Sequence, residues 1–406
     1  MNKKYLLPIL FVTLLLDMVG VGMVIPIIPI LFTDPASSSF LLQGYSQSGQ
    51  FFIAGLVTAL FGLMQFLAAP VLGELSDIYG RKKLLTLGVG ILALSQILFG
   101  FAVEIGSVAL ILFSRAVAGL AGGNFSIAQA SVADISEPGD RAKNFGLIGA
   151  AFGIGFIVGP VLGGWIATLA QDPAVPFWCA GALGILNVLF ITLFLPETRV
   201  VVRARTHSFT LLRGINNIRA AFKDVDARPI YTASFLYVCG FSFMVSFMGV
   251  LLVNKFSFSE SAIGTFFGAV GIWMVFTQIV IIRILSRIYS ERQILRFSMP
   301  TMALALVAFP FAPSPAVLYT LMPFIAIPQG LSMSNLGALV SKSVSKEKQG
   351  AALGINSSLL ALAQGTIPLV AGLGSGVFGV SVPFFAGALC VMAGWYVLFV
   401  IRRMQS

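Results

Sequence analysis

Charged side chains are scarce in this sequence. Only 10% of its 406 residues are Asp, Glu, Lys or Arg, whereas 58% are hydrophobic. A soluble fold has no core large enough to bury so much apolar surface, so we expect most of the chain to lie in lipid. The net charge of +10 is then explained by basic residues on the cytoplasmic side of a membrane, and nucleic-acid binding is not expected.

Residues that bind metals or carry out catalysis are equally few. His207 is the single histidine and lies in a basic connecting segment, and Cys179, Cys239 and Cys390 each fall within an apolar run. The sequence therefore contains no disulfide framework, no metal-ligand spacing and no Ser/His/Asp or paired-carboxylate set. We expect neither an enzyme nor a cofactor nor a metal site.

Apolar runs long enough to cross a bilayer recur along the chain. They predict twelve spans, at about 6–32, 50–72, 84–103, 107–132, 144–168, 177–196, 229–253, 261–284, 294–311, 316–340, 351–374 and 382–401. The connections predicted to be cytoplasmic carry the Lys and Arg residues, which places both chain termini in the cytoplasm. We therefore expect a multi-pass protein of the inner membrane, acting as a monomer.

The longest polar stretch divides the chain into two halves. It runs over residues 197–228 and carries apolar residues at helical spacing, Leu211, Ile215, Ile218 and Phe222, which predict a short amphipathic helix on the membrane surface. The expected organisation is a six-helix bundle over 1–196, this cytoplasmic linker over 197–228, and a second six-helix bundle over 229–406. At an offset of 210 residues, 283–295 lies over 73–85 with reversed charges, which indicates an internal repeat.

A short charged segment, GELSDIYGRKKLL, separates the second and third spans. Gly73 and Gly80 bracket Asp77, and Arg81 opens a run of three cations. Any cytoplasmic hairpin carries such cations and a glycine for the turn. That simple interpretation does not account for Asp77 beside the cations, or for Gly73 at a helix end, where we expect a backbone to approach closely.

Two ionisable residues, Asp17 and Arg115, lie well inside predicted spans. A charge near the bilayer centre costs about 2.5–3.5 kcal/mol on insertion scales, so each should face a cavity or a partner. Asp17 shares a helical face with Thr13 and Gly20. The face of Arg115 also carries Gly119, Gly122, Ser126 and Gln129. Two interpretations remain open: a structural ion pair, or an Asp17 that gains and loses a proton close to Arg115.

The fifth span is unusually rich in glycine. It reads GAAFGIGFIVGPVLGG over 149–164, with small residues repeating every four positions and a proline that bends the helix. Ordinary close packing of helices through small residues is the simpler interpretation. Six glycines with a Gly-Pro and a terminal Gly-Gly form a much rarer arrangement.

With these motifs, the chain resembles the drug:proton antiporters of the major facilitator superfamily, and most of all their tetracycline-exporter group. The resemblance covers residues 6 to about 200 well and the second half mainly by hydropathy. It implies an all-α fold of two pseudosymmetric six-helix bundles around a central cavity, working by alternating access. The residues that match the family motifs are Asp17 and Arg115 for proton coupling, Gly73, Asp77, Gly80 and Arg81 for the gating loop, and Gly153, Gly155, Gly159, Pro160, Gly163 and Gly164 for the antiporter motif of helix 5. In the gate, Asp77 is expected to pair with Arg81 or with Arg141.

The sequence departs from the tetracycline exporters in helix 3. They carry a further acid there, whereas Ser95 and Gln96 occupy the nearest positions here. This difference puts tetracycline itself in doubt as the substrate. Buried amides are the candidates for lining the substrate cavity, although several should instead join helices: Gln65, Asn124, Gln129, Asn187, Gln278, Gln329, Asn335, Asn356 and Gln364.

Three classes of function are open to a chain with these features. The resemblance favours proton-driven export of lipophilic, neutral or cationic small molecules. A proton symporter or facilitator for uptake of a nutrient or lipid is the alternative, which the antiporter-type fifth span disfavours. A membrane enzyme or a receptor lacks both a catalytic set and a large domain outside the membrane.

Overall fold

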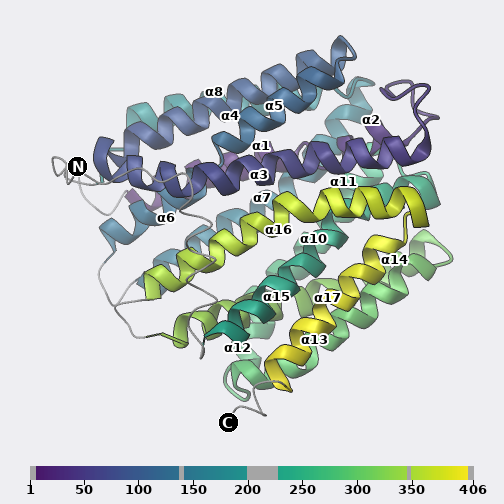
Figure 1. The fold of residues 1–406 in the computed structure, drawn as a ribbon. Coiled ribbons are helices and arrows are strands. Elements are labelled where there is room, and N and C mark those ends of the chain that lie inside the picture. The colour runs from purple at the N-terminus through teal and green to yellow at the C-terminus, as the bar shows by residue number, and fades with distance from the viewer. Residues whose placement is uncertain (1–5, 137–140, 199–226, 345–348, 401–406) are drawn as a thin grey trace. The chain divides into compact units, whose positions relative to one another are not determined.

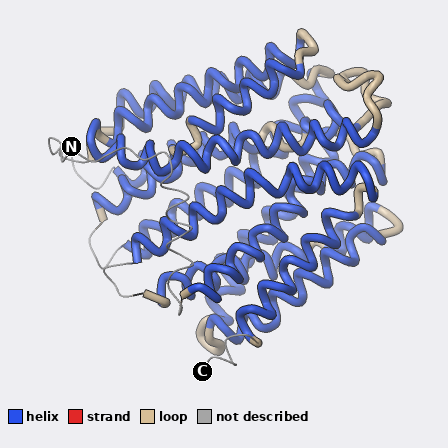
Figure 2. Tube along the Cα trace, viewed as in Figure 1, coloured by secondary structure: helices blue, strands red, loops and turns tan. Residues whose placement is uncertain are grey.

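The computed structural model describes residues 6–136, 141–198, 227–344 and 349–400. Helices account for nearly all of these residues, and the connecting loops are short (Figure 2). The amphipathic helix predicted in the linker lies outside the described residues, as do both ends of the chain.

Before the linker, the described helices are α1 (Leu6–Gly22), α2 (Ile27–Thr33), α3 (Gln47–Tyr79), α4 (Arg81–Glu104), α5 (Val108–Leu120), α6 (Asn124–Ile135), α7 (Arg141–Ala170) and α8 (Val175–Phe194). After it come α10 (Arg228–Phe256), α11 (Glu260–Phe276), the π-helical turn η2 (Thr277–Ile281), α12 (Ile282–Leu285), α13 (Glu291–Ala308), the 3₁₀ turn η3 (Phe309–Phe311), α14 (Pro315–Leu321), α15 (Pro323–Lys342), α16 (Gln349–Phe378) and α17 (Val382–Phe399). In the described part of the chain, eleven helical stretches are long and apolar enough to cross a membrane. All-helical spans were predicted from hydropathy, and this prediction is confirmed.

The fourth predicted span is divided into α5 and α6 by a turn over residues 121–123. A break inside a bilayer releases backbone groups from the helix, and these groups need other partners because lipid offers none. Gln65 on α3 supplies one, since its Nε2 donates to the carbonyl oxygen of Gly122 at 2.9 Å. A side chain on Gly122 or Gly123 would collide with Gln65 or Leu72, so both glycines allow α3 to approach the break.

Contacts divide the described residues into two units. One contains 6–43, 63–136, 141–198 and 258–268, and the other contains 44–62, 227–257, 269–344 and 349–400. In the first unit α1 packs on α7 and α8. Helix α4 packs on α8 and α5, and Figure 1 shows these three helices side by side. In the second unit α10 packs on α16 and α17, and α13 packs on α15 and α17.

The unit borders do not follow the predicted domain limits at 196 and 229. The first part of α3 belongs to the second unit, where Gly55 lies against the backbone of Pro368 on α16. The first part of α11 belongs to the first unit, where Gly264 lies against the backbone of Pro160 on α7. Glycine permits these close crossings because it has no Cβ. The division into two six-helix bundles stays a prediction.

Candidate functional site

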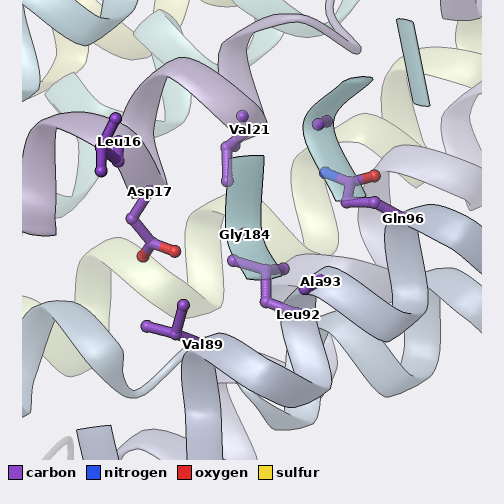
Figure 3. Close-up of a pocket in the computed structure, with 10 residues that line it drawn as sticks. Leu16, Asp17, Val21, Val89, Leu92, Ala93, Gln96 and Gly184 are labelled. Carbon is purple, nitrogen blue, oxygen red and sulfur yellow. The ribbon is translucent and has the colours of Figure 1, made fainter. Parts of the chain in front are cut away.

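Asp17 lies in the interior of the first unit. Its residue is 8% exposed, and it lines a small pocket between α1, α4 and α8. The other lining residues are mostly apolar: Leu16, Gly20, Val21, Val89, Leu92, Ala93, Gln96, Ala180 and Gly184. Figure 3 shows the carboxylate leaving α1 and pointing toward Val89 on α4. An ionisable side chain inside a membrane span and among apolar neighbours is a candidate functional group.

Asn124 contacts α4 at Val89, a residue that lines the same pocket as Asp17: in the orientation that satisfies both of its polar atoms, its amide oxygen accepts from the Val89 N–H and its nitrogen donates to the Ala121 carbonyl, each at 3.3 Å. Asn124 is the first residue of α6, directly after the break in the fourth span, and is 3% exposed. The sequence predicted Arg115 on α5 as the neighbour of Asp17 and listed Asn124 only as a cavity residue. The proton-coupling roles of Asp17 and Arg115 stay predictions.

A second buried polar contact lies one helical turn from Asp17. Asn187 on α8 is fully buried and donates from Nδ2 to the carbonyl oxygen of Thr13 on α1 at 2.9 Å. Among the described residues, the Thr13 hydroxyl and the Asn187 Oδ1 have no hydrogen-bond partner. Buried polar atoms without partners are uncommon in folded proteins. This contact between α1 and α8 therefore has hydrogen-bonding capacity to spare.

The glycine-rich helix α7 packs directly against α1, the helix that carries Asp17. A Cβ on Gly155 would meet Met18, one on Gly159 would lie 2.7 Å from the Gly22 Cα, and one on Gly163 would meet the backbone of Met23. These three positions follow the four-residue spacing noted in the sequence. The glycine face is thus used for close backbone contact with α1.

The end of the same glycine motif contacts α11. A Cβ on Gly164 would collide with the backbone of Glu260 and Ser261, close to where Gly264 crosses Pro160. Gly149, by contrast, has open space around it, and Gly153 is half-buried. The packing role belongs to the C-terminal part of the predicted motif.

A second polar cluster surrounds Arg81 at the start of α4. The Arg81 Nη2 lies 2.5 Å from the Asp77 Oδ1 on α3, and its Nε lies 3.1 Å from the Asp134 Oδ2 at the end of α6. Nη1 also donates to the Ser76 hydroxyl. Arg81 itself is only 5% exposed. One buried guanidinium group therefore joins the ends of three helices.

Glu197 completes this cluster from the end of α8. Its Oε1 accepts a hydrogen bond from the Arg81 backbone N–H at 2.8 Å, and its Oε2 accepts one from Lys82 N–H at 3.2 Å. A carboxylate at a helix N-terminus satisfies unpaired N–H groups and interacts favourably with the helix dipole. The chain reaches this geometry through Gly80, whose φ of 97° suits glycine. A side chain at Gly80 would also collide with Glu197.

Gly73, in the predicted gating loop, differs from expectation. Gly73 lies within α3, which continues to Tyr79, and a Cβ there would meet no atom within 4 Å. The expected close backbone approach at Gly73 is therefore absent from the described structure. The turn is limited to Gly80, since α3 and α4 extend to either side of it. Arg141 is the first residue of α7, and its side chain is outside the described part of the chain.

Most of the predicted cavity amides hold helices together. Asn356 accepts from the Ser234 hydroxyl at 2.8 Å, Gln329 accepts from the Tyr237 hydroxyl, and Asn335 donates to the Leu331 carbonyl of its own helix at 2.7 Å. Gln278 is exposed within the π-helical turn and exchanges hydrogen bonds with Ser334 at 3.1 and 3.2 Å. Gln129 is half-buried on α6.

Sequence reasoning missed Asp134, Glu197 and Tyr237. Asp134 and Glu197 are ordinary surface acids in the sequence, and only their packing beside Arg81 reveals their contribution. Tyr237 is fully buried on α10. An apolar run gives no signal that a tyrosine within it points toward another helix.

Comparisons with known proteins agree with this architecture. The family model described as Major Facilitator Superfamily matches residues 10–368. The tetracycline resistance protein, class C, of Escherichia coli is 29% identical over 377 residues, covering 91% of this chain and 89% of that protein. The quinolone resistance protein NorA of Staphylococcus aureus (strain N315) is 25% identical over 376 residues, covering 92% and 90%. The crystal structure of the human organic anion transporter MFSD10 matches with a TM-score of 0.75 and 25% identity, covering 98% of this chain and 100% of that one.

Proposed function

The chain belongs to the major facilitator superfamily of membrane transporters, and from this premise we propose that it exports lipophilic small molecules in exchange for protons. The cargo class follows from the drug-resistance proteins that it resembles along most of its length. Proton exchange follows from Asp17. The resemblance to exporters supports the direction, and the uptake alternative would require a different cargo.

The observation that carries this proposal is a carboxyl group buried in a membrane-spanning helix among mostly apolar side chains. A charge in such a place is expensive, so it is retained where a function needs it. Asp17 is the only acid in α1, and no residue of α8 is charged. Gain of a proton removes the charge of Asp17, which changes the relative stability of conformations that differ in how well they solvate a carboxylate.

Alternating access supplies the link between proton and cargo. An apolar cavity with scattered amides suits a molecule held by shape, aromatic contact and one or two hydrogen bonds. Gln278 and Ser334 are candidates for such hydrogen bonds because they are polar and incompletely buried within membrane-spanning helices. The Arg81 cluster, placed by charge distribution at the cytoplasmic end, then acts as the inner gate.

A second cargo class, organic anions, is favoured by a specific similarity. The human protein whose crystal structure matches this chain is described as an organic anion transporter. Arg115 on α5 is a cation within the helices that could attract an anionic cargo. We propose that the protein resides in the inner membrane as a monomer with both termini and the linker in the cytoplasm.

The test is a substrate screen in proteoliposomes with an imposed pH gradient, reading both cargo flux and proton flux. The panel contains tetracycline, a quinolone, ethidium as a lipophilic cation, a fluorescent organic anion, a sugar and an amino acid. Proton-driven counterflow of a drug or dye is the expected result. Movement of the sugar or amino acid together with protons would reject the exporter and support uptake.

A further inference from the structure

Two buried polar atoms lie together where α1 packs on α8. Asn187 is fully buried and donates from Nδ2 to the Thr13 carbonyl oxygen at 2.9 Å, and Thr13 is itself 1% exposed. Among the described residues, the Thr13 hydroxyl and the Asn187 Oδ1 are without a hydrogen-bond partner. The Thr86 hydroxyl on α4, by contrast, donates to the Lys82 carbonyl oxygen of its own helix at 2.8 Å. The two unpaired atoms therefore point to a small ligand that both donates and accepts.

These atoms lie next to Asp17 along the contact between the two helices. At one end of that contact a Cβ on Gly20 would lie 3.8 Å from the Ala180 carbonyl oxygen. At the other end Thr13 accepts from Asn187. The two helices therefore run antiparallel, and Asp17 comes between these two contacts. Asp17 is one helical turn from Thr13 on the same face of α1.

The Asp17 carboxyl group points toward the turn that carries the unpaired atoms. Side chains of an α-helix lean toward its N-terminus, and Figure 3 shows this carboxyl group directed at Val89 on α4. The next residue, Gly90, lies beside α8, since a Cβ on it would be 3.7 Å from the Val188 side chain. Because Val188 follows Asn187, the carboxyl group is directed at the level of the Asn187 amide.

Apolar side chains close the far side of the pair. They follow it toward the start of α1 and belong to one buried cluster: Leu6, Leu10, Ile191 and Leu195. Asp17 and the Cys179 thiol are the titratable groups of α1 and α8. The charges of the other helices packed on α1 lie at helix ends: Asp134 on α6, and Arg141 and Lys143 on α7. In the predicted topology α1 begins at the cytoplasmic side, so the pair lies between Asp17 and the cytoplasm.

From this geometry we propose that Thr13 and Asn187 bind one water molecule, which takes the proton of Asp17 on its way to the cytoplasm. The water donates to the Asn187 Oδ1, accepts from the Thr13 hydroxyl and bonds the Asp17 carboxyl group. Three polar partners are typical of a buried water. In the transfer the Asp17 O–H bond breaks and an O–H bond forms on the water. The water then passes a proton to cytoplasmic water when the apolar cluster opens. The proposal rests on the proposed function, in which Asp17 exchanges protons.

The sign of a stability change tests the site itself. Thr13→Val keeps the shape of the side chain and removes its hydroxyl. If that hydroxyl binds a water, the variant in lipid nanodiscs should unfold at a lower temperature than the wild type. If the hydroxyl has no partner, the substitution removes a desolvated polar group, and an equal or higher unfolding temperature would reject the site. Thr86→Val gives the change for the same substitution at a hydroxyl bonded within its own helix.

A kinetic experiment follows the proton and needs no known cargo. After a pH jump, time-resolved infrared spectroscopy records the carboxyl C=O band of Asp17, which is identified by its loss in Asp17→Asn. Release of the proton should slow by about fivefold or more in Thr13→Val and in Asn187→Leu, the factor that corresponds to one ordinary hydrogen bond. Thr13→Ser keeps the hydroxyl and should release the proton at the wild-type rate, as should Thr86→Val.

The outcomes separate the relay from the proposed function. If Asp17→Asn removes no carboxyl band, Asp17 exchanges no proton and the proposed function fails together with the relay, whereas the unfolding temperatures still decide whether the pair binds water. If the band responds but Thr13→Val releases the proton as fast as Thr13→Ser, the relay is wrong and proton exchange at Asp17 stands. Slow release in both variants would assign Thr13 a packing role and also reject the relay.

Discussion

Arg81 and Glu291 are the first residues of α4 and α13, and each bonds a residue of opposite charge at the end of a later helix in its own unit. Arg81 pairs with Asp134 on α6, and Glu291 pairs with Lys342 on α15. The two pairs are related by nearly the same sequence offset as the internal repeat, with all charges reversed. The repeat inferred from sequence thus includes a conserved geometry of ion pairing, whose sign differs between the halves.

Removal of the Arg81 guanidinium group should destabilise the first unit. Arg81→Ala leaves the Asp77 and Asp134 carboxylates near each other without their shared cation, and we expect a loss of about 1–3 kcal/mol of unfolding free energy. Lys83→Ala is the matched control, because Lys83 is exposed on the same helical turn. Thermal unfolding of the purified variants measures the difference. Equal unfolding temperatures for the two variants would show that the cluster adds no stability.

Asp77 should control the inner gate. Asp77→Asn weakens the attraction to Arg81, so we expect lower transport and a shift toward the inward-open state with normal membrane insertion. Distances between spin labels at Lys83→Cys and Ser286→Cys report that shift. Glu260→Gln serves as a control for the loss of a carboxylate elsewhere. An unchanged distance distribution in Asp77→Asn would argue against the gating role.

Alanine substitutions at two glycines with positive φ distinguish the cost of backbone strain from the cost of a steric collision. Gly80 has a φ of 97° and a Cβ there would meet Glu197, whereas Gly106 has a φ of 68° and open space around it. Alanine at Gly106 should cost about 1–2 kcal/mol from the left-handed backbone alone. Alanine at Gly80 should cost more, because it also displaces the carboxylate that caps α4. Unfolding of both variants, with Glu197→Gln as a third, gives the comparison, and equal losses at the two glycines would contradict the cap.

Asp17→Asn should abolish uphill transport. The asparagine keeps the size of the side chain but cannot release a proton, so cargo binding is expected to survive while accumulation driven by a pH gradient does not. Asp172→Asn, at the Ala170–Val175 connection, is a control because Asp172 lies in a loop. Flux is measured in proteoliposomes with whichever panel compound the wild type transports. A variant that still concentrates that compound in response to the gradient would remove Asp17 from the mechanism.

Labelling of single cysteines tests the predicted topology. Ser38→Cys should react with a membrane-impermeant maleimide in intact cells, whereas Thr206→Cys and Ser406→Cys should react only after the membrane is opened. The asymmetry of Lys and Arg residues is the reason. Labelling of Thr206→Cys from outside would place the linker outside the cell and contradict the predicted topology.

The sequence by itself determined the helical architecture, because lipid forces each crossing segment to satisfy its own backbone hydrogen bonds. Apolar run length therefore predicted the spans, and the cost of a buried charge identified Asp17 and Arg115. The turn at Gly80 was equally local, since a single residue with positive φ forms it. The glycine spacing of α7 predicted a close helix contact, although not which helix would fill it.

Only the tertiary structure decided which side chains meet. Asn187 bonds the Thr13 carbonyl, and Glu197 accepts from the Arg81 N–H that begins α4, across more than a hundred residues of chain in each case. The break in the fourth span likewise depends on Gln65, which arrives from α3 to satisfy the Gly122 carbonyl. Hydropathy and helical periodicity describe each helix alone, whereas these contacts depend on the rotation and crossing of helices packed together, which no local pattern in the sequence specifies.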